Sequence, residues 1–300
     1  MSGGDIGASV RQRLLNRARA EGRPFQEMLQ YFAMERFLYR LAKSEYSDRF
    51  ILKGALLLTA WNAPVTRPTM DIDLAGRTSN ELEHIRSIIA KVCDLVTDRD
   101  GLEFDSDSIE VQRIKEDAEY GGVRVRFNGT LAKARIPMQV DIGFGDVIVP
   151  KPCEVAYPAL LEFPPPVLQA YSKETVVAEK LEALTALGML NSRIKDYYDL
   201  ALLAQHYPFD GALLAEAIHS TFRHRGTVVE ESPVGLTHAY SSDPARAAQW
   251  RAFVRRSRLD DGWQLEQIVQ QVRAFAAGPL FALAGNRPFL QSWRAGGPWG

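Results

Sequence analysis

Two aspartates separated by one residue, Asp71 and Asp73, lie in an apolar stretch and have the spacing best suited to chemistry. The stretch Met70–Leu74 predicts a strand, in which residues two apart project to the same face. The two carboxylates would repel each other there, while Ile72 and Leu74 would face the core. A divalent cation would remove the repulsion. Mg²⁺, or Mn²⁺ in its place, is the expected ion, because it binds one or two carboxylates together with substrate phosphates.

A third carboxylate, Asp141, is expected to join this pair. It lies with Gln139 on the polar side of another predicted strand, Ile136–Asp146. There it would bind a second metal ion or accept the proton of an attacking hydroxyl. An Asp-x-Asp pair also occurs in surface loops, where it only caps or is solvated, but the apolar neighbours favour metal binding.

A second candidate site lies at Lys53 and Gly54, between a predicted strand, Phe50–Leu52, and a predicted helix, Ala55–Trp61. The N–H groups at a helix N-terminus bind phosphate, and a glycine lets the ligand approach. Lys53 would add a positive charge. For these residues alone, an ordinary turn between strand and helix is the favoured explanation.

A third candidate site combines Lys180, inside an otherwise apolar helix, with the start of the next helix. Arg193 and Lys195 fall in that helix's first turn if Ser192 caps it, where cations oppose the helix dipole and indicate an anion site. Asp196 and Asp199 share a helix face, so one of them could orient Lys180. A structural ion-pair network between two helices is the alternative.

The elements that must position these residues indicate an α+β protein. Helices and strands occur together up to residue 150, and the sequence then becomes mainly helical. We expect N-terminal helices and a catalytic core over residues 1–150, a stiff proline-rich linker over 151–168, and a helical C-terminal domain over 169–300. The last residues, 285–300, show no periodicity and are expected to be loosely ordered.

Composition excludes several other classes of protein. The 300 residues carry a formal net charge of −1, so binding to nucleic acid would require a local basic patch. The N-terminus lacks the pattern of a secretory signal, and no apolar run approaches the roughly 20 residues that span a bilayer. Cys93 and Cys153 lie far apart and predict neither a disulfide framework nor a zinc site. A cytoplasmic protein without membrane association is expected.

Four sequence elements together resemble the AbiEii/AbiGii-type (MenT-like) nucleotidyltransferase toxins. They are FILKGALLL, RPTMDIDL, AEKLEAL and RIKDYYDL, in this order, and with the N-terminal segment they cover roughly residues 8–205. The resemblance implies the DNA polymerase β-like nucleotidyltransferase core, a mixed sheet with flanking helices, followed by a helical C-terminal part.

The resemblance also implies roles for individual residues. Gly54 and Ala55 would support the triphosphate of an NTP, although the family usually has Gly or Ser where this chain has Ala55. Asp71 and Asp73 would bind Mg²⁺. Lys180 would contact the nucleotide phosphates, and Asp196 would be essential.

The implied reaction is attack of an acceptor hydroxyl on the α-phosphate of an NTP, with release of pyrophosphate. The expected acceptor is the 3′ end of tRNA, so that the toxin blocks translation, and the expected partner is a cognate antitoxin, a winged-helix or kinase-like protein. Nucleotidyl or phosphoryl transfer to a protein or small-molecule hydroxyl is the alternative, and a binding protein without turnover is a third.

RNA binding is expected on a basic predicted helix that bears Arg251, Arg255 and Arg258, with Trp250 and Phe253 facing inward. A solvated basic face explains the same arginines. Further candidate phosphate contacts are Arg124, Arg126, Arg223 and Arg225.

Thr69, two residues before Asp71, is placed to contact the nucleotide. Phosphorylation there would bring negative charge beside the carboxylates and should block nucleotide binding. An antitoxin could act in this way or by covering the site.

Overall fold

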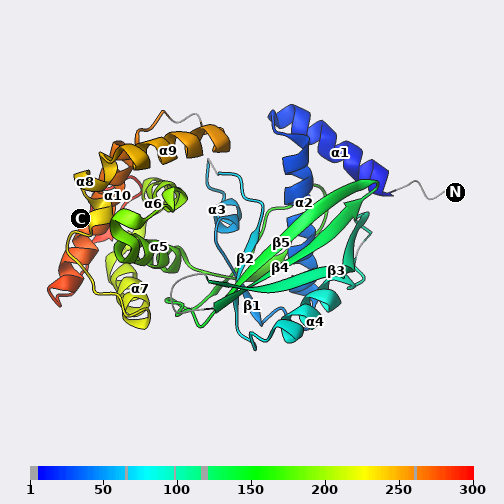
Figure 1. Ribbon diagram of the computed structural model, residues 1–300, viewed down its shortest axis with the longest axis horizontal. Helices are drawn as coiled ribbons and strands as arrows, with labels where there is room; N and C mark the ends of the chain where they lie inside the picture. The colour runs from blue at the N-terminus through cyan, green and yellow to red at the C-terminus, as the bar shows by residue number, and fades with distance from the viewer. Residues whose placement is uncertain (1–5, 65–66, 98, 116–120, 260–261) are drawn as a thin grey trace. The chain divides into compact units, whose positions relative to one another are not determined.

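The structure is a computed structural model that describes residues 6–64, 67–97, 99–115, 121–259 and 262–300 (Figure 1). The chain forms two compact units. The first unit contains residues 1–62, 68–145 and 153–170, and the second contains residues 63–67, 146–152 and 171–300.

A seven-stranded mixed sheet forms the centre of the first unit. Its strands are β1 Phe50–Lys53, β2 Ile72–Gly76, β3 Leu102–Lys115, β4 Gly121–Leu131, β5 Ala134–Phe144, β6 Cys153–Ala156 and β7 Val167–Ala170. They lie in the order β3-β4-β5-β2-β1-β7-β6. Strand β2 runs antiparallel to β1 and parallel to β5, so the two predicted carboxylate strands are direct neighbours.

One face of this sheet is apolar because the central strands alternate in sequence. Ile72 and Leu74 of β2 and Val140 and Ile142 of β5 are buried on it, as predicted. Two helices of the first unit pack against the sheet: α2 (Phe25–Lys43) on β5 and α4 (Leu82–Cys93) on β3. The packing leaves the alternate positions of the same strands for polar side chains.

Four helices accompany the sheet: α1 Ile6–Glu21, α2 Phe25–Lys43, α3 Leu56–Ala60 and α4 Leu82–Cys93. Helix α2 is buried without interruption from Met28 to Leu41, and Phe37 packs edge-on against Phe104 of β3. Its charged residues are therefore paired: Arg36 and Arg40 both donate to Asp100 at 3.0 Å.

The second unit is mainly helical, as predicted. Its elements are α5 Lys173–Leu187, η1 Gly188–Leu190, α6 Ile194–His206, β8 Phe209–Asp210, α7 Gly211–His224, η2 Val234–Leu236, α8 His238–Ser241, α9 Pro244–Ser257, α10 Leu265–Ala284 and β9 Ser292–Trp293. Side-chain oxygens of Ser172, Asp210 and Asp243 cap α5, α7 and α9.

The predicted proline-rich linker is wrong, because β6 and the first residues of β7 lie within residues 151–168. Strand β7 pairs with β1, and β6 pairs with β7 at the edge of the sheet. The run Pro164–Pro166 falls in the connection between these two strands. There the missing N–H groups cost no ladder hydrogen bonds.

The tail is also ordered, contrary to prediction. Trp293 is buried and donates from Nε1 to the carbonyl of Ala204, while Trp299 stacks on Phe275 at 5.7 Å between ring centroids. Aromatic contacts replace helical periodicity here, which explains why the pattern gave no signal.

In the part of the chain that the structure describes, the helices are too short or too polar to cross a lipid bilayer.

Candidate active site

A row of four charged side chains crosses four adjacent strands of the first unit. The strand register pairs Lys53 with Asp73, Asp73 with Asp141, and Asp141 with Arg124. Paired positions project to the same face of a sheet, which here is the face opposite to the apolar side chains. The charges along the row therefore run positive, negative, negative, positive.

Asp71 completes a group of three carboxylates with this row. It lies directly before β2, which begins at Ile72 and not at Met70 as predicted. One oxygen each of Asp71, Asp73 and Asp141 lies within 4.8 Å of the other two. These hard oxygen ligands fit Mg²⁺ or Mn²⁺, so the three aspartates that the sequence singled out form one potential metal site.

Gly54 touches this group directly. Its φ of +73° lies in the left-handed region, and a Cβ built on it would stand 1.9 Å from Oδ2 of Asp73. No side chain larger than hydrogen fits between the turn and the carboxylate. The following helix α3 is shorter than predicted, Leu56–Ala60, so its dipole is weak and the turn's main visible role is to admit Asp73.

Arg124 holds the third carboxylate through two parallel hydrogen bonds. Its Nε lies 2.8 Å from Oδ1 of Asp141, and its Nη2 lies 2.7 Å from Oδ2. The hydrogen bond to Asp141 raises the pKa of the Arg124 guanidinium, and the nearby Asp71 and Asp73 add to the effect. Asp141 is only 6% exposed, so the carboxylate of this pair is largely shielded from water.

Thr69 and helix α2 fix the segment that leads into the site. The Thr69 hydroxyl donates to Oδ1 of Asp71 at 2.5 Å, and its backbone N–H donates to the hydroxyl of Tyr31 at 3.2 Å. Gln30 donates from Nε2 to the carbonyl of Pro137 at 3.0 Å. Thr69 therefore contacts Asp71 in this structure. Gln30 and Tyr31 were not predicted as site residues, although a glutamine within an apolar helix is a signal for a buried polar contact.

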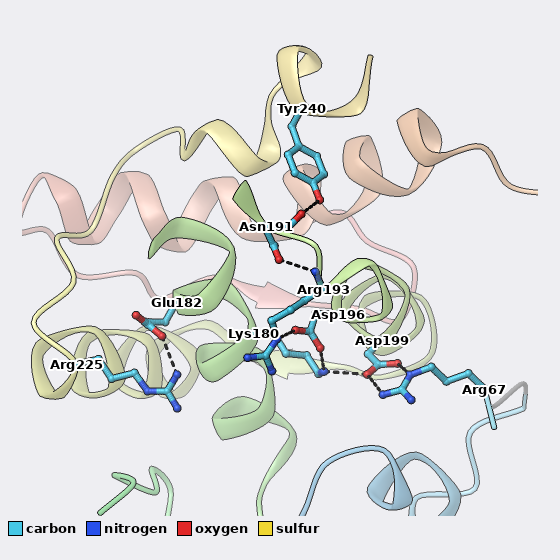
Figure 2. Close-up of polar contacts among 9 residues, drawn as sticks. All are labelled: Arg67, Lys180, Glu182, Asn191, Arg193, Asp196, Asp199, Arg225 and Tyr240. Atoms are coloured by element: carbon cyan, nitrogen blue, oxygen red, sulfur yellow. Dashed lines mark hydrogen bonds and ion pairs between the residues drawn. The ribbon is translucent and has the colours of Figure 1, made fainter. Parts of the chain in front are cut away.

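A second constellation lies in the second unit (Figure 2). The ammonium of Lys180 on α5 donates to Oδ1 of Asp196 at 2.6 Å and to Oδ2 of Asp199 at 2.8 Å. Arg67 binds Asp199 through two hydrogen bonds of 2.9 and 3.0 Å, and Arg193 binds Asp196 at 2.7 Å. The predicted contact of Lys180 with an aspartate of α6 is confirmed, and both aspartates take part.

The electrostatics of this Lys180 cluster (Arg67, Lys180, Arg193, Asp196 and Asp199) follow from burial and pairing. Burial opposes charge on Lys180, but Asp196 and Asp199 outweigh it and raise the pKa of Lys180. Burial also opposes ionisation of the two aspartates, yet the cations lower the pKa of Asp196 and of Asp199. Three cations thus face two ionised carboxylates, and the cluster carries a net positive charge.

The start of α6 differs from the prediction. The helix begins at Ile194, and Arg193 rather than Ser192 occupies the cap position. Asn191 accepts the Arg193 N–H through Oδ1 at 2.8 Å, and its carbonyl accepts from the hydroxyl of Tyr240 at the same distance. Arg193 is left with a side chain that is 40% exposed, while Lys195 is exposed in the first turn.

Arg225, a candidate phosphate contact, is instead bound by carboxylates. Its Nη1 donates to Oε2 of Glu182 at 2.8 Å, as Figure 2 shows, and its Nη2 lies 3.4 Å from Oδ1 of Asp146. Burial opposes its charge, but Glu179, Glu182 and Asp146 outweigh burial and raise the pKa of Arg225. The pairing makes it part of the scaffold of the second unit. Arg223 remains exposed.

Helix α9 presents the predicted basic surface. Trp250 and Phe253 are buried, as expected, and Arg251 and Arg255 are exposed one turn apart. Arg258 is also exposed, but it lies at the C-cap with a left-handed φ of +54° and not within the helix.

A mixed sheet with a carboxylate group and a following helical unit is the architecture expected of a nucleotidyltransferase of the α+β class. The sequence profile of the family described as "Nucleotidyl transferase AbiEii toxin, Type IV TA system" matches residues 36–271. The chain belongs to this family: it is a nucleotidyltransferase, the toxin component of a type IV toxin–antitoxin system, and its partner is an antitoxin.

Two solved structures resemble the chain. A candidate nucleotidyltransferase from H. pylori has 16% sequence identity and a TM-score of 0.48, over 87% of this chain and 96% of that chain. JHP933 from Helicobacter pylori has 15% identity and a TM-score of 0.49, over 87% of this chain and 93% of that chain. Among curated proteins, none matches.

Proposed function

We propose that this nucleotidyltransferase uses Mg²⁺ or Mn²⁺ to transfer a nucleoside monophosphate from an NTP to the 3′ end of tRNA, which would block translation. The single observation that carries the metal-dependent chemistry is the group formed by Asp71, Asp73 and Asp141. When bound, a divalent cation neutralises charge on the attacking and leaving oxygens. Asp71 and Asp73 would hold it, and Asp141 would either bind metal with them or accept the proton of the attacking hydroxyl.

Cationic side chains support binding of the NTP phosphates. Lys53 adjoins Asp73 in the charged row, and Gly54 and Ala55 follow it in the turn. In the second unit, the net positive charge of the Lys180 cluster suits an anion. An ammonium has three donors, and two of those of Lys180 are directed to Asp196 and Asp199, which leaves one for a phosphate. Arg193 and Lys195 are exposed enough to contribute.

The acceptor is proposed from the basic surface of α9. Arg251, Arg255 and Arg258 are exposed, and α9 contains no acidic residue from Pro244 to Ser257. Such a surface would bind the phosphate backbone of RNA without reading its sequence. This surface favours tRNA over a small-molecule acceptor, which needs no basic patch.

The acceptor is tested by incubating the protein with each α-labelled NTP, Mg²⁺ and separate pools of total tRNA, protein and small molecules. We expect label at the 3′ ends of tRNA, with pyrophosphate released. Label found only on protein or on a small molecule would overturn the tRNA proposal while leaving the class of enzyme intact.

The site residues are tested by growth inhibition. We expect Asp71→Ala, Lys180→Ala and Asp196→Ala each to abolish toxicity, whereas Asp48→Ala, at a position whose side chain is 80% exposed, should remain toxic. Because Lys180→Ala leaves two buried carboxylates without their shared cation, it also requires a thermal unfolding measurement. A fully toxic Asp71→Ala variant would sink the metal proposal.

Control by the antitoxin is proposed to act on the carboxylate group, through a winged-helix or kinase-like partner. Phosphorylation of Thr69 would remove the hydroxyl that donates to Asp71 and place negative charge beside it. Mass spectrometry of toxin co-expressed with the neighbouring gene product tests this. Toxin that is inhibited with Thr69 unmodified would point to covering of the site instead.

A further inference from the structure

The feature that the reaction leaves unexplained is the ion pair between Arg124 and Asp141. Both carboxylate oxygens of Asp141 accept hydrogen bonds from one guanidinium, at 2.8 and 2.7 Å. A second donor, Nε2 of Gln139, lies 3.3 Å from Oδ2. The carboxylate that completes the metal site is therefore already neutralised by the protein itself. A divalent cation and Arg124 would compete for the same oxygens.

The position of Arg124 within the row shows why this competition matters. Asp71, Asp73 and Asp141 bring three negative charges within 4.8 Å of one another, and Lys53 and Arg124 flank them on the neighbouring strands. Without an ion, the flanking cations limit the repulsion among the carboxylates. Once an ion is bound, the same cations would leave an excess of positive charge, which an NTP triphosphate would neutralise.

Arg124 is also the more accessible partner of the pair. Its side chain is 28% exposed, whereas that of Asp141 is 8% exposed, so an incoming phosphate could reach the guanidinium. A planar guanidinium that binds two carboxylate oxygens fits two phosphate oxygens equally well.

We propose that Arg124 is an exchangeable counter-ion: it holds Asp141 in the protein without nucleotide and passes to the triphosphate of the NTP when Asp141 turns to a divalent cation. The inference rests on the proposed metal-dependent transfer and assigns to it a phosphate-binding residue on β4. It also makes binding of the ion and of the NTP mutually dependent, because each would release or engage the same side chain.

The proposed exchange predicts that Arg124→Gln changes two affinities in opposite directions, that for Mn²⁺ and that for the NTP. Binding of Mn²⁺ alone, followed by the electron paramagnetic resonance signal of the free ion, should tighten about three- to tenfold because its competitor is gone. Binding of a non-hydrolysable NTP analogue at saturating Mn²⁺ should weaken by about tenfold or more, since one bidentate phosphate contact is lost.

Arg135→Gln is the matched control. Arg135 lies on β5, the strand of Asp141, is exposed, and donates from Nε to Oδ1 of Asn128 at 2.9 Å. It should change both affinities by less than about twofold, because it removes the same formal charge at a position that is screened by solvent. Should Arg124→Gln fail to fold, Arg124→Lys carries the same test, with the same signs and smaller changes.

Weaker Mn²⁺ binding by Arg124→Gln would overturn the proposal, because Arg124 would then only hold Asp141 in place for the ion. Unchanged binding of the NTP analogue would overturn it as well. The proposed function is tested separately. If Arg124→Gln tightens Mn²⁺ binding and weakens NTP binding, but no label reaches tRNA, the exchange holds and the tRNA proposal fails. If label reaches tRNA but the two affinities do not change in opposite directions, the function holds and the exchange fails.

Discussion

The contact between Gly54 and Asp73 shows that a single residue type can decide whether a carboxylate fits in this site. The close approach depends on a missing Cβ, whereas the glycine was predicted to allow a phosphate to approach. Both reasons can hold, because the same turn lies beside the carboxylates that would bind the ion. The structural reason is the one that a substitution tests directly.

Gly54→Ala should lower the rate of label transfer by about a hundredfold, because Asp73 must move by about an ångström to make room for a methyl group. Gly22→Ala is the control: Gly22 has a similar left-handed φ, +64°, but a Cβ there meets nothing within 4 Å. Both variants carry similar backbone strain, so they should lose similar thermal stability. Equal losses of activity would contradict the role assigned to the Asp73 contact.

The buried carboxyl group of Glu35 should make the stability of the protein depend on pH. Burial in α2 raises the pKa of Glu35 to about 7, although the Leu160 N–H donates to its Oε2 at 2.7 Å. The folded state therefore holds the proton more tightly than the unfolded state. The stabilisation is fully present below the ordinary pKa of 4.5 and is lost as the pH rises to about 7.

Replacement of Glu35 by glutamine, which carries a neutral amide, should remove this loss of stability at rising pH. In urea unfolding measured from pH 4 to pH 8, the wild-type protein should lose stability across the interval, on the order of a few kcal/mol at most, and Glu35→Gln should lose less. Equal pH dependence in the two proteins would show that Glu35 is ionised in the folded state.

Among the elements, those with alternating or helical apolar patterns could be predicted from the sequence, and those held by distant contacts could not. Strands β2 and β5 alternate, so Asp73 and Asp141 were placed on one face, and the register joined them. Strand β3 was missed because it lies at the sheet edge, contains many polar residues and is interrupted between Asp105 and Glu110. Alternation is weak where one strand edge faces solvent.

In the candidate site, too, contacts that follow from local spacing could be predicted and contacts between distant residues could not. The local pairing of Asp196 and Asp199 with Lys180 followed from helix spacing, but the bond from Arg67 to Asp199 spans 132 residues and has no local signal. The cap of α6 was assigned to Ser192, whereas Arg193 occupies the cap position and the helix begins at Ile194. Ser192 has the chemistry of a capping residue, but the backbone path decides which residue begins the helix.

The Lys180 cluster joins α5 to α6, and its pH dependence can be predicted at the scale of elements. Because the pKa values of Asp196 and Asp199 are lowered, their stabilising contribution is present above the ordinary aspartate pKa of about 3.9 and is lost as the pH falls below it. The contribution of Lys180, whose pKa is raised, is lost only as the pH rises above its ordinary value of 10.5.

Asp199→Asn should therefore lower stability at pH 7 by about 3 to 5 kcal/mol, since it leaves Arg67 and Lys180 buried with one carboxylate fewer. It should also flatten the fall in melting temperature between pH 5 and pH 3, as followed by circular dichroism. The exposed control Asp48→Asn should reproduce the wild-type curve. An acid transition as steep as that of the wild type would show that other groups cause it.

At the scale of the whole molecule, attraction to RNA has to come from a local basic surface, because the net charge does not provide it. The formal charge of −1 gives no overall attraction to RNA, yet the segment from Pro244 to Arg258 contains five arginines and no acidic residue. They are Arg246, Arg251, Arg255, Arg256 and Arg258. If this segment binds the acceptor, affinity for tRNA should fall steeply with salt while affinity for Mn²⁺ should depend on the carboxylates of the first unit.

Arg251→Ala combined with Arg255→Ala should therefore weaken tRNA binding and reduce the slope of log affinity against log salt by about 2, one for each lost phosphate contact. Filter binding over a range of salt concentrations measures the slope. Arg273→Ala removes one arginine at an exposed position of α10, outside this segment, and as the control should leave the slope almost unchanged. An unchanged slope in the double variant, with folding intact, would mean that α9 is only a solvated basic face. The acceptor would then have to be bound by other cations, with the exposed Arg223 of α7 as the next candidate.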